Sequence, residues 1–159
     1  MKNGLYLSLL FLLFSFISFG QSLSTSVDYI TKKLRVCESA DHGHKLEGAT
    51  IYGDDCYYSI IFSHEYYKGW EYRFRFEDLD SNNITVKTNV EGKKYLWIGT
   101  VEGDDLIHIY YPENEFGPAF TSKDNSIWIV NENDETLERL RRAFINAIKM
   151  CNQGDPFRE

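Results

Sequence analysis

Residues 133–151 read NDETLERLRRAFINAIKMC, and this stretch decides the fold of the chain. Its apolar residues recur with the 3.6-residue period of an α-helix, which places them on one stripe. The stripe comprises Leu137, Leu140, Phe144, Ala147, Ile148 and Cys151. Charged residues occupy the other side, so we predict an amphipathic helix whose apolar stripe is buried against the rest of the chain.

The residues at both ends of this stretch are typical of helix boundaries. Asn133 or Asp134 can accept hydrogen bonds from the first unpaired backbone amides. Gly154 tolerates the positive φ found just past a helix, and Pro156 prevents its continuation. The basic residues of the polar side alternate with acidic ones, which predicts a solvated, partly ion-paired surface rather than a site for anions.

Upstream of the helix the apolar period changes to two, as in β-strands. The clearest strand covers residues 70–76, where Trp70, Tyr72, Phe74 and Phe76 alternate with charged side chains. Seven strands are predicted, at residues 48–52, 56–62, 70–76, 84–88, 94–101, 106–111 and 126–130. Residues 81–83 are interpreted as a turn and residues 112–125 as a long loop, because the second segment contains two prolines.

These elements predict an α+β domain. Short connections favour an antiparallel meander of about seven strands, closed by the C-terminal amphipathic helix. A further N-terminal helix is expected over residues 22–36, with Ser24 as its candidate cap. The order of elements resembles a pleckstrin-homology-like barrel, whose C-terminal helix plugs one open end. A curved open sheet covered by a helix is the alternative.

Residues 1–20 have the pattern of a cleaved signal peptide. Lys2 supplies a short positive region, residues 5–19 form an apolar run, and Ser18 and Gly20 are the small residues before a cut at Gln21. The run is shorter than the roughly 20 residues of a membrane span. We therefore predict export to the periplasm or beyond, with residues 21–159 as a single globular domain that has no stable membrane span.

The charge and the cysteines limit the partners and the compartment. The formal net charge is −7, which disfavours nucleic acid and anionic lipid as partners. In an oxidising compartment, Cys37, Cys56 and Cys151 would give one disulfide and one free thiol. Their spacing leaves all three pairings open, and three reduced, buried cysteines are the alternative.

The C-terminal segment also carries a resemblance. Ala143-Phe144, Ala147-Ile148-Lys149 and Cys151, followed by Asp155-Pro156-Phe157, resemble the ending of an uncharacterised family of small exported proteins of Gram-negative bacteria. The signal segment ending Phe19-Gly20-Gln21 and residues 76–80 are similar to the same group. The resemblance implies architecture and export, and it brings no active-site residues.

Adjacent tyrosines are the candidate binding residues. Because neighbours in a strand point to opposite faces, one member of each pair should be exposed and could join an aromatic patch for peptide or sugar. The pairs are Tyr57 and Tyr58, Tyr66 and Tyr67, and Tyr110 and Tyr111. Packing of these rings under loops is the alternative interpretation.

The histidines support a second hypothesis, a small hydrolase or a metal-dependent enzyme. Asp41, His42 and His44 could offer two imidazoles and a carboxylate to a metal, completed by Asp54 and Asp55 or by His64. No nucleophile motif accompanies them, and no pair of cysteines has metal-binding spacing. We therefore expect a non-enzymatic exported domain without cofactor or metal, whose partner is a protein, an envelope component or a glycan.

Overall fold

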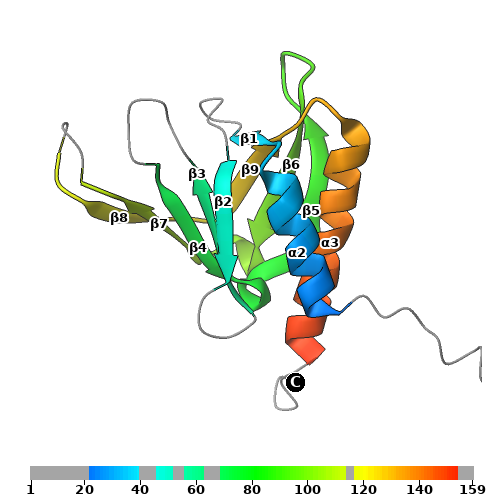
Figure 1. The fold of residues 1–159 in the computed structure, drawn as a ribbon, viewed down its shortest axis with the longest axis horizontal. Helices are drawn as coiled ribbons and strands as arrows, with labels where there is room; N and C mark the ends of the chain where they lie inside the picture. Colours follow the sequence, from blue (N-terminus) through cyan, green and yellow to red (C-terminus); the bar gives the residue numbers. More distant parts are fainter. Residues whose placement is uncertain (1–21, 40–45, 52–55, 63–68, 114–116, 154–159) are drawn as a thin grey trace, which may run out of the picture.

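In the part of the chain that the structure describes, two antiparallel sheets pack with two α-helices (Figure 1). The computed structural model describes residues 22–39, 56–62, 69–113 and 117–153, together with the backbone of residues 46–51. The predicted signal peptide, the histidines at positions 42, 44 and 64, and the tail from Gly154 lie outside these residues. The predicted α+β class is confirmed. The two predicted helices, one at each end of the described chain, are confirmed as well.

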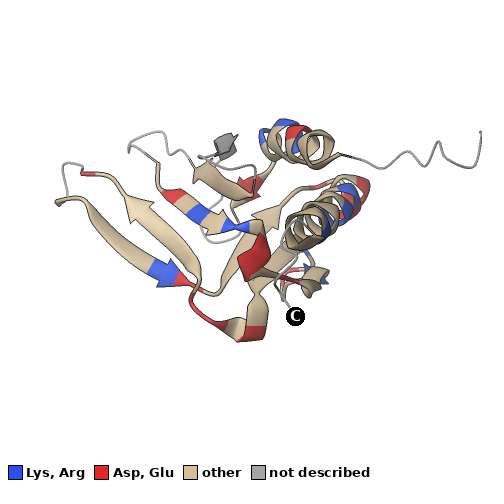
Figure 2. Ribbon diagram, turned by 90° about the horizontal axis from the view of Figure 1, so that it is seen from below, with Lys and Arg blue, Asp and Glu red and all other residues tan. Residues whose placement is uncertain are grey.

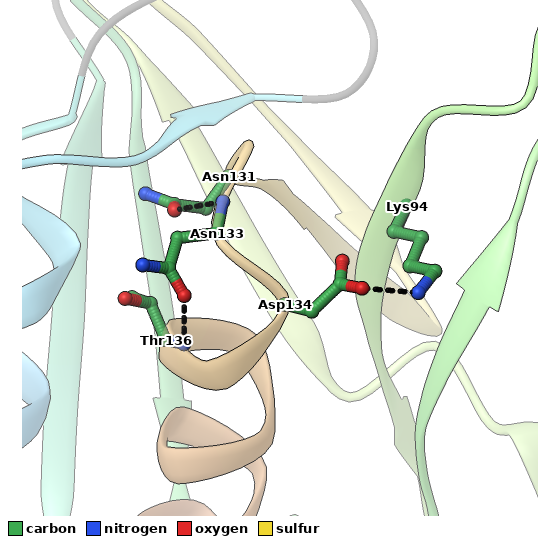
Figure 3. A network of polar contacts seen from close by, with 5 residues as sticks. All are labelled: Lys94, Asn131, Asn133, Asp134 and Thr136. Carbon is green, nitrogen blue, oxygen red and sulfur yellow. Dashed lines mark hydrogen bonds and ion pairs between the residues drawn. The ribbon is translucent and has the colours of Figure 1, made fainter.

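Helix α3, Asp134–Gln153, is the predicted C-terminal helix. Asn133 is its N-cap, because its Oδ1 accepts a hydrogen bond from the backbone N–H of Thr136 at 3.2 Å (Figure 3). Its buried side chains are those of the predicted stripe, with Ala143 added: Leu137, Leu140, Ala143, Phe144, Ala147, Ile148 and Cys151. Acidic and basic residues alternate along its outer side (Figure 2), and Glu138 pairs with Arg141 at 2.9 Å.

Helix α2, Leu23–Leu34, packs antiparallel to α3. At one end of the pair, Asn146 donates a side-chain hydrogen bond to Ser26 at 2.8 Å. At the other end, Asn131 donates to the carbonyl of Val36 at 2.6 Å. The prediction that Ser24 caps α2 is wrong: Ser22 is the last residue with extended backbone, and its hydroxyl accepts from the amide of Thr25 at 3.1 Å.

The first sheet, called sheet A, has four strands in the order β1-β9-β6-β5. Their bounds are Glu38–Ser39 for β1, Ser126–Val130 for β9, Lys94–Thr100 for β6 and Leu79–Thr88 for β5. The second, sheet B, has five strands in the order β2-β3-β4-β7-β8. Their bounds are Leu46–Ile51, Tyr57–Phe62, Glu71–Arg75, Ile107–Tyr111 and Phe120–Asp124. Two short 3-10 helices, η1 at Phe76–Asp78 and η2 at Val101–Gly103, follow β4 and β6.

The strands do not form a closed barrel, and they do not pair in simple chain order. Strand β4 pairs with β7 across the intervening β5 and β6, and β6 pairs with β9 across β7 and β8. Residues 81–83 are not a turn but part of the continuous strand β5, whose register shifts between Leu79 and Ile84. The predicted loop 112–125 contains strand β8, which is polar because it is an exposed edge of sheet B.

Helix α3 connects the cores of the two sheets. On the sheet B side, the ring of Phe144 lies 6.1 Å from that of Phe76, which in turn contacts Tyr58 and Phe74. On the sheet A side, α3 packs against β5 and β6. The alternation predicted for 70–76 is confirmed at Tyr72, Phe74 and Phe76, which are buried, whereas Trp70 is only half-buried and Glu71 is buried as well. No helix in the described part of the chain combines the length and apolarity needed to cross a bilayer.

The structure selects one of the three cysteine pairings. Cys56, just before β3, forms a disulfide with Cys151 in the last turn of α3, and their Cα atoms are 5.8 Å apart. Cys37 is a free thiol with 1% of its surface exposed. Burial raises the pKa of Cys37 to about 11, partly offset by its contact with the Asn131 amide. The free thiol is therefore protonated and protected.

Candidate functional site

Three aromatic side chains project from the side of sheet A that faces away from the core. They are Tyr95 and Trp97 of β6 and Trp128 of β9. The residues between them, Leu96 and Ile129 among others, are fully buried in the core. Because strand side chains alternate between faces, the three rings belong to the outer face. We call these three residues the aromatic face.

The rings of the aromatic face contact one another. Trp97 and Trp128 are directly opposite in the β6–β9 register, with ring centroids 5.0 Å apart. Tyr95 lies nearly parallel to Trp128, at a centroid distance of 5.5 Å. The indole N–H of Trp128 donates to the hydroxyl of Ser126 at 3.1 Å, which fixes the orientation of the ring. Trp128 is 38% exposed, so a large apolar ring is presented to solvent in a defined position.

Lys87 of β5 covers part of this face. It is paired with Tyr95 in the β5–β6 register, and its Nζ lies 3.9 Å from the centroid of the Trp97 ring. This is the geometry of a cation–π interaction, which holds the ammonium group over the indole. Among the ion pairs of the described residues, none includes Lys87. An uncompensated positive charge therefore borders the aromatic face.

Gly99 allows the packing beneath this edge of the face. A Cβ atom at position 99 would lie 2.1 Å from Nδ2 of Asn83 and 2.9 Å from Nε1 of Trp97. Because glycine has no side chain, the Asn83 amide and the Trp97 indole can occupy the space beside this position. The same contact places the Asn83 nitrogen against the backbone of β6.

A cavity of about 190 Å³ lies at the other edge of the aromatic face. Tyr95 and Trp128 form its apolar wall, and its remaining lining is mostly polar: Glu38, Ser39, Asn89, Glu91, Lys93 and Val130. A second cavity of about 300 Å³ shares Glu38, Lys93 and Val130 with it and extends to Asp134. The two cavities together form a groove beside an aromatic wall.

The walls of this groove are held in place by polar contacts. Oδ1 of Asn89 accepts hydrogen bonds from the amides of Glu91 and Lys93, at 3.0 and 2.9 Å, which orders the turn between β5 and β6. Lys94 forms an ion pair with Asp134 at the start of α3 (Figure 3). Asn131 accepts from the amide of Asn133 at 2.8 Å and so orders the connection from β9 to α3. These contacts fix the positions of the walls of the groove.

The predicted tyrosine patch is not assembled by the four tyrosines that the structure describes. Tyr58 is fully buried, and its hydroxyl shares a hydrogen bond of 2.7 Å with Thr31. Burial raises the pKa of this phenol above its ordinary range. Tyr57 is half-buried. The ring of Tyr111 stacks on that of Phe120, with centroids 4.3 Å apart. Tyr110 is 37% exposed, and the guanidinium of Arg73 lies over its ring. Tyr66 and Tyr67 lie outside the described residues.

Most residues of the predicted histidine site lie outside the part of the chain that the structure describes. Asp41, His42, His44, Asp54, Asp55 and His64 are all among the residues that the structure does not describe. His108 is exposed on the outer side of β7, opposite Arg73 in register. Within the described residues, no three His, Cys, Asp or Glu side chains gather in a way that could hold a metal ion.

Another cavity, of about 440 Å³, lies between α2 and α3. Its charged lining includes Glu135, Arg139 and Arg142, and Glu135 is paired with Arg139 along the helix. This agrees with the prediction of a partly ion-paired outer surface on α3. The cavity has one aromatic ring, Tyr29, in its lining and lacks the flat wall found on sheet A.

Sequence reasoning missed the aromatic face, although a signal for it exists. In residues 94–100, KYLWIGT, and 126–130, SIWIV, aromatic rings alternate with aliphatic residues. The aliphatic positions satisfy the core, so an aromatic ring at the alternate position must lie on the outer face.

Comparison of the chain with protein-family models, curated proteins and solved structures finds no match.

Proposed function

We propose that the chain is an exported, non-enzymatic domain that binds a glycan on the aromatic face of sheet A. The observation that carries this proposal is the exposed ring of Trp128, which stacks beside Tyr95 at the wall of a polar-lined cavity. A pyranose ring packs its C–H groups on an aromatic surface, while its hydroxyls bind amide and carboxylate side chains.

The dimensions of the site favour a chain of sugars over a single small molecule. Pockets for drug-sized ligands usually have about 300–1,000 Å³, and the cavity beside Trp128 has about 190 Å³. One sugar ring would therefore occupy the cavity, and its neighbours would lie on the open aromatic face. Asn89, Glu38 and Glu91 would supply the hydrogen-bonding groups for the ring in the cavity.

Two features support export as part of this proposal. Residues 1–20 have the pattern of a signal peptide. The disulfide between Cys56 and Cys151 suits an oxidising compartment, where such bonds persist. An exported domain would meet the glycans of the cell envelope or of the surroundings.

Titration with defined oligosaccharides tests the proposal. The probes are cellohexaose, chitohexaose, a β-1,4-galactan hexamer and soluble peptidoglycan fragments, followed by calorimetry and by tryptophan fluorescence. We expect at least one probe to bind, and Trp128→Ala to weaken that binding by about tenfold or more, since truncation of an aromatic residue at the centre of a binding surface costs about 2 kcal/mol or more. Phe120→Ala is the matched control, because Phe120 is 56% exposed on sheet B.

Two results would overturn the proposal. One is the absence of binding to every probe at millimolar concentration. The other is a Trp128→Ala protein that binds as tightly as the original chain. Near-ultraviolet circular dichroism of each variant shows that the fold is retained.

A further inference from the structure

Two buried polar atoms at the β5 edge of the aromatic face have no hydrogen-bond partner among the described residues. They are Oγ1 of Thr85 and Nε1 of Trp97. Thr85 and Trp97 are directly opposite in the β5–β6 register, so the two side chains lie on the same outer face. Buried polar groups are nearly always hydrogen-bonded, and an unpaired one costs free energy. At this edge of the face, no hydrogen-bond acceptor among the described residues serves Thr85 or Trp97.

The chemistry of these atoms defines what is missing. An indole Nε1–H can only donate, and a threonine hydroxyl can donate. Lys87 lies two residues along β5 from Thr85, on the same face, with its ammonium group over the Trp97 ring. Two neutral donors and one cation together suit an oxygen that carries negative charge, because charge-assisted hydrogen bonds are the stronger kind.

The opposite edge of the face has the opposite charge. The registers place Lys87, Tyr95, Val130 and Glu38 in one row across β5, β6, β9 and β1. Glu38 also lines the cavity beside Trp128, where the carboxylate of Glu91 is paired with the ammonium group of Lys93 at 3.6 Å. A carboxylate on the ligand would be repelled at this edge and attracted at the edge of Lys87. The face therefore favours one orientation of an acidic chain.

We propose that the glycan bound by the aromatic face is acidic, with a uronate residue at the β5 edge. Its carboxylate accepts hydrogen bonds from Thr85 and Trp97 and pairs with Lys87, whose side chain moves aside from the indole. A neutral sugar of the same chain occupies the cavity at Glu38. This inference rests on the proposed function and names the ligand class of the same site.

Matched pairs of probes test the inference. Cellohexaose is compared with a β-1,4-glucuronan hexamer, and a β-1,4-galactan hexamer with a galacturonan hexamer, each at low and high salt. We expect the acidic member of at least one pair to bind about fivefold or more tightly at low salt, and salt to reduce this preference.

Three variants assign the preference to the proposed residues. Lys87→Gln should abolish the preference for the acidic probe, measured as the ratio of acidic to neutral affinity. Thr85→Val and Trp97→Phe each remove one donor and keep the shape, so each should reduce the preference. Thr85→Val should not destabilise the fold, because the hydroxyl that it removes is unpaired. Lys123→Gln is the control, since Lys123 is an exposed lysine of sheet B.

The outcomes separate the inference from the proposed function. If neutral and acidic probes bind equally, or if the preference survives Lys87→Gln, the inference is wrong and the glycan site stands. Unchanged preference in both Thr85→Val and Trp97→Phe would mean that water or the Asn83 amide satisfies these donors, which also overturns it. If no probe binds, the proposed function fails, and the inference fails with it.

Discussion

Removal of the disulfide is expected to cost a large share of the stability of the domain. Cys56 and Cys151 are separated by 95 residues, so the bond closes a loop that includes most of the domain. The loop-closure entropy for a length near 100 residues corresponds to about 4–5 kcal/mol of stabilisation. Domains of this kind have a total unfolding free energy of about 5–15 kcal/mol. The Cys56→Ala/Cys151→Ala protein should therefore be folded only marginally.

Urea denaturation followed by circular dichroism measures this effect. We expect the unfolding midpoint of the double variant to fall by about 2 M, given a slope of about 1–3 kcal/mol per molar urea. The slope itself should rise, because the unfolded chain without the crosslink exposes more surface. These two changes together identify a restraint that acts on the unfolded state.

Cys37→Ala is the matched control, because it removes a buried cysteine and leaves the disulfide intact. Its cost should be about 1 kcal/mol, the typical effect of one substitution. If the double variant loses no more stability than Cys37→Ala does, the disulfide does not stabilise the domain by restraining the unfolded chain. Alkylation under denaturing conditions should also label one thiol in the oxidised protein and three after reduction.

Three other changes have expected outcomes. Gly99→Ala should lower the unfolding free energy by about 1–3 kcal/mol in a urea titration, because its Cβ would collide with the Asn83 side chain; Gly117→Ala, where no atom lies within 4 Å, should change it little. Asn133→Ala should cost about 1 kcal/mol through loss of the α3 cap, and Asn133→Ser should recover most of it. Cys37 has an ordinary pKa of 9.0 that burial raises to about 11, so the folded state keeps a proton that the unfolded state loses. The unfolding free energy of the original chain should therefore fall by about 1 kcal/mol between pH 8 and 10, whereas that of Cys37→Ala should stay nearer constant. If the unfolding free energies of both proteins change equally with pH, burial of the Cys37 thiol is not the cause.

The helix and most strands were predictable because their signals are local. The stripe from Leu137 to Cys151 and the alternation from Trp70 to Phe76 are periodic over neighbouring residues, and burial follows the period directly. The cap at Asn133 is a local signal as well. Strand β8 was missed because it is a polar edge strand that follows two prolines, so neither composition nor alternation marks it.

Strand pairing and the disulfide were not predictable because they depend on distant contacts. Nothing in β4 specifies β7 as its neighbour, since any strand with an apolar face could occupy that place. The same holds for Cys151, which pairs with Cys56 only because α3 ends beside the start of β3. The contacts of the aromatic face depend on distant residues in the same way: the pattern SIWIV places Trp128 on the outer face, but only the pairing of β6 with β9 brings it beside Tyr95 and Trp97.

The interleaved strand order has a consequence for the molecule as a whole. Sheet A is assembled from three separate parts of the chain, and sheet B takes its strands from the intervals between them. A cut anywhere between β4 and β8 therefore separates paired strands in both sheets, and a fragment that contains all of sheet A must also contain all of sheet B. The domain should consequently be lost or gained as one unit, and a gene for half of it would encode an unpaired set of strands rather than a smaller protein.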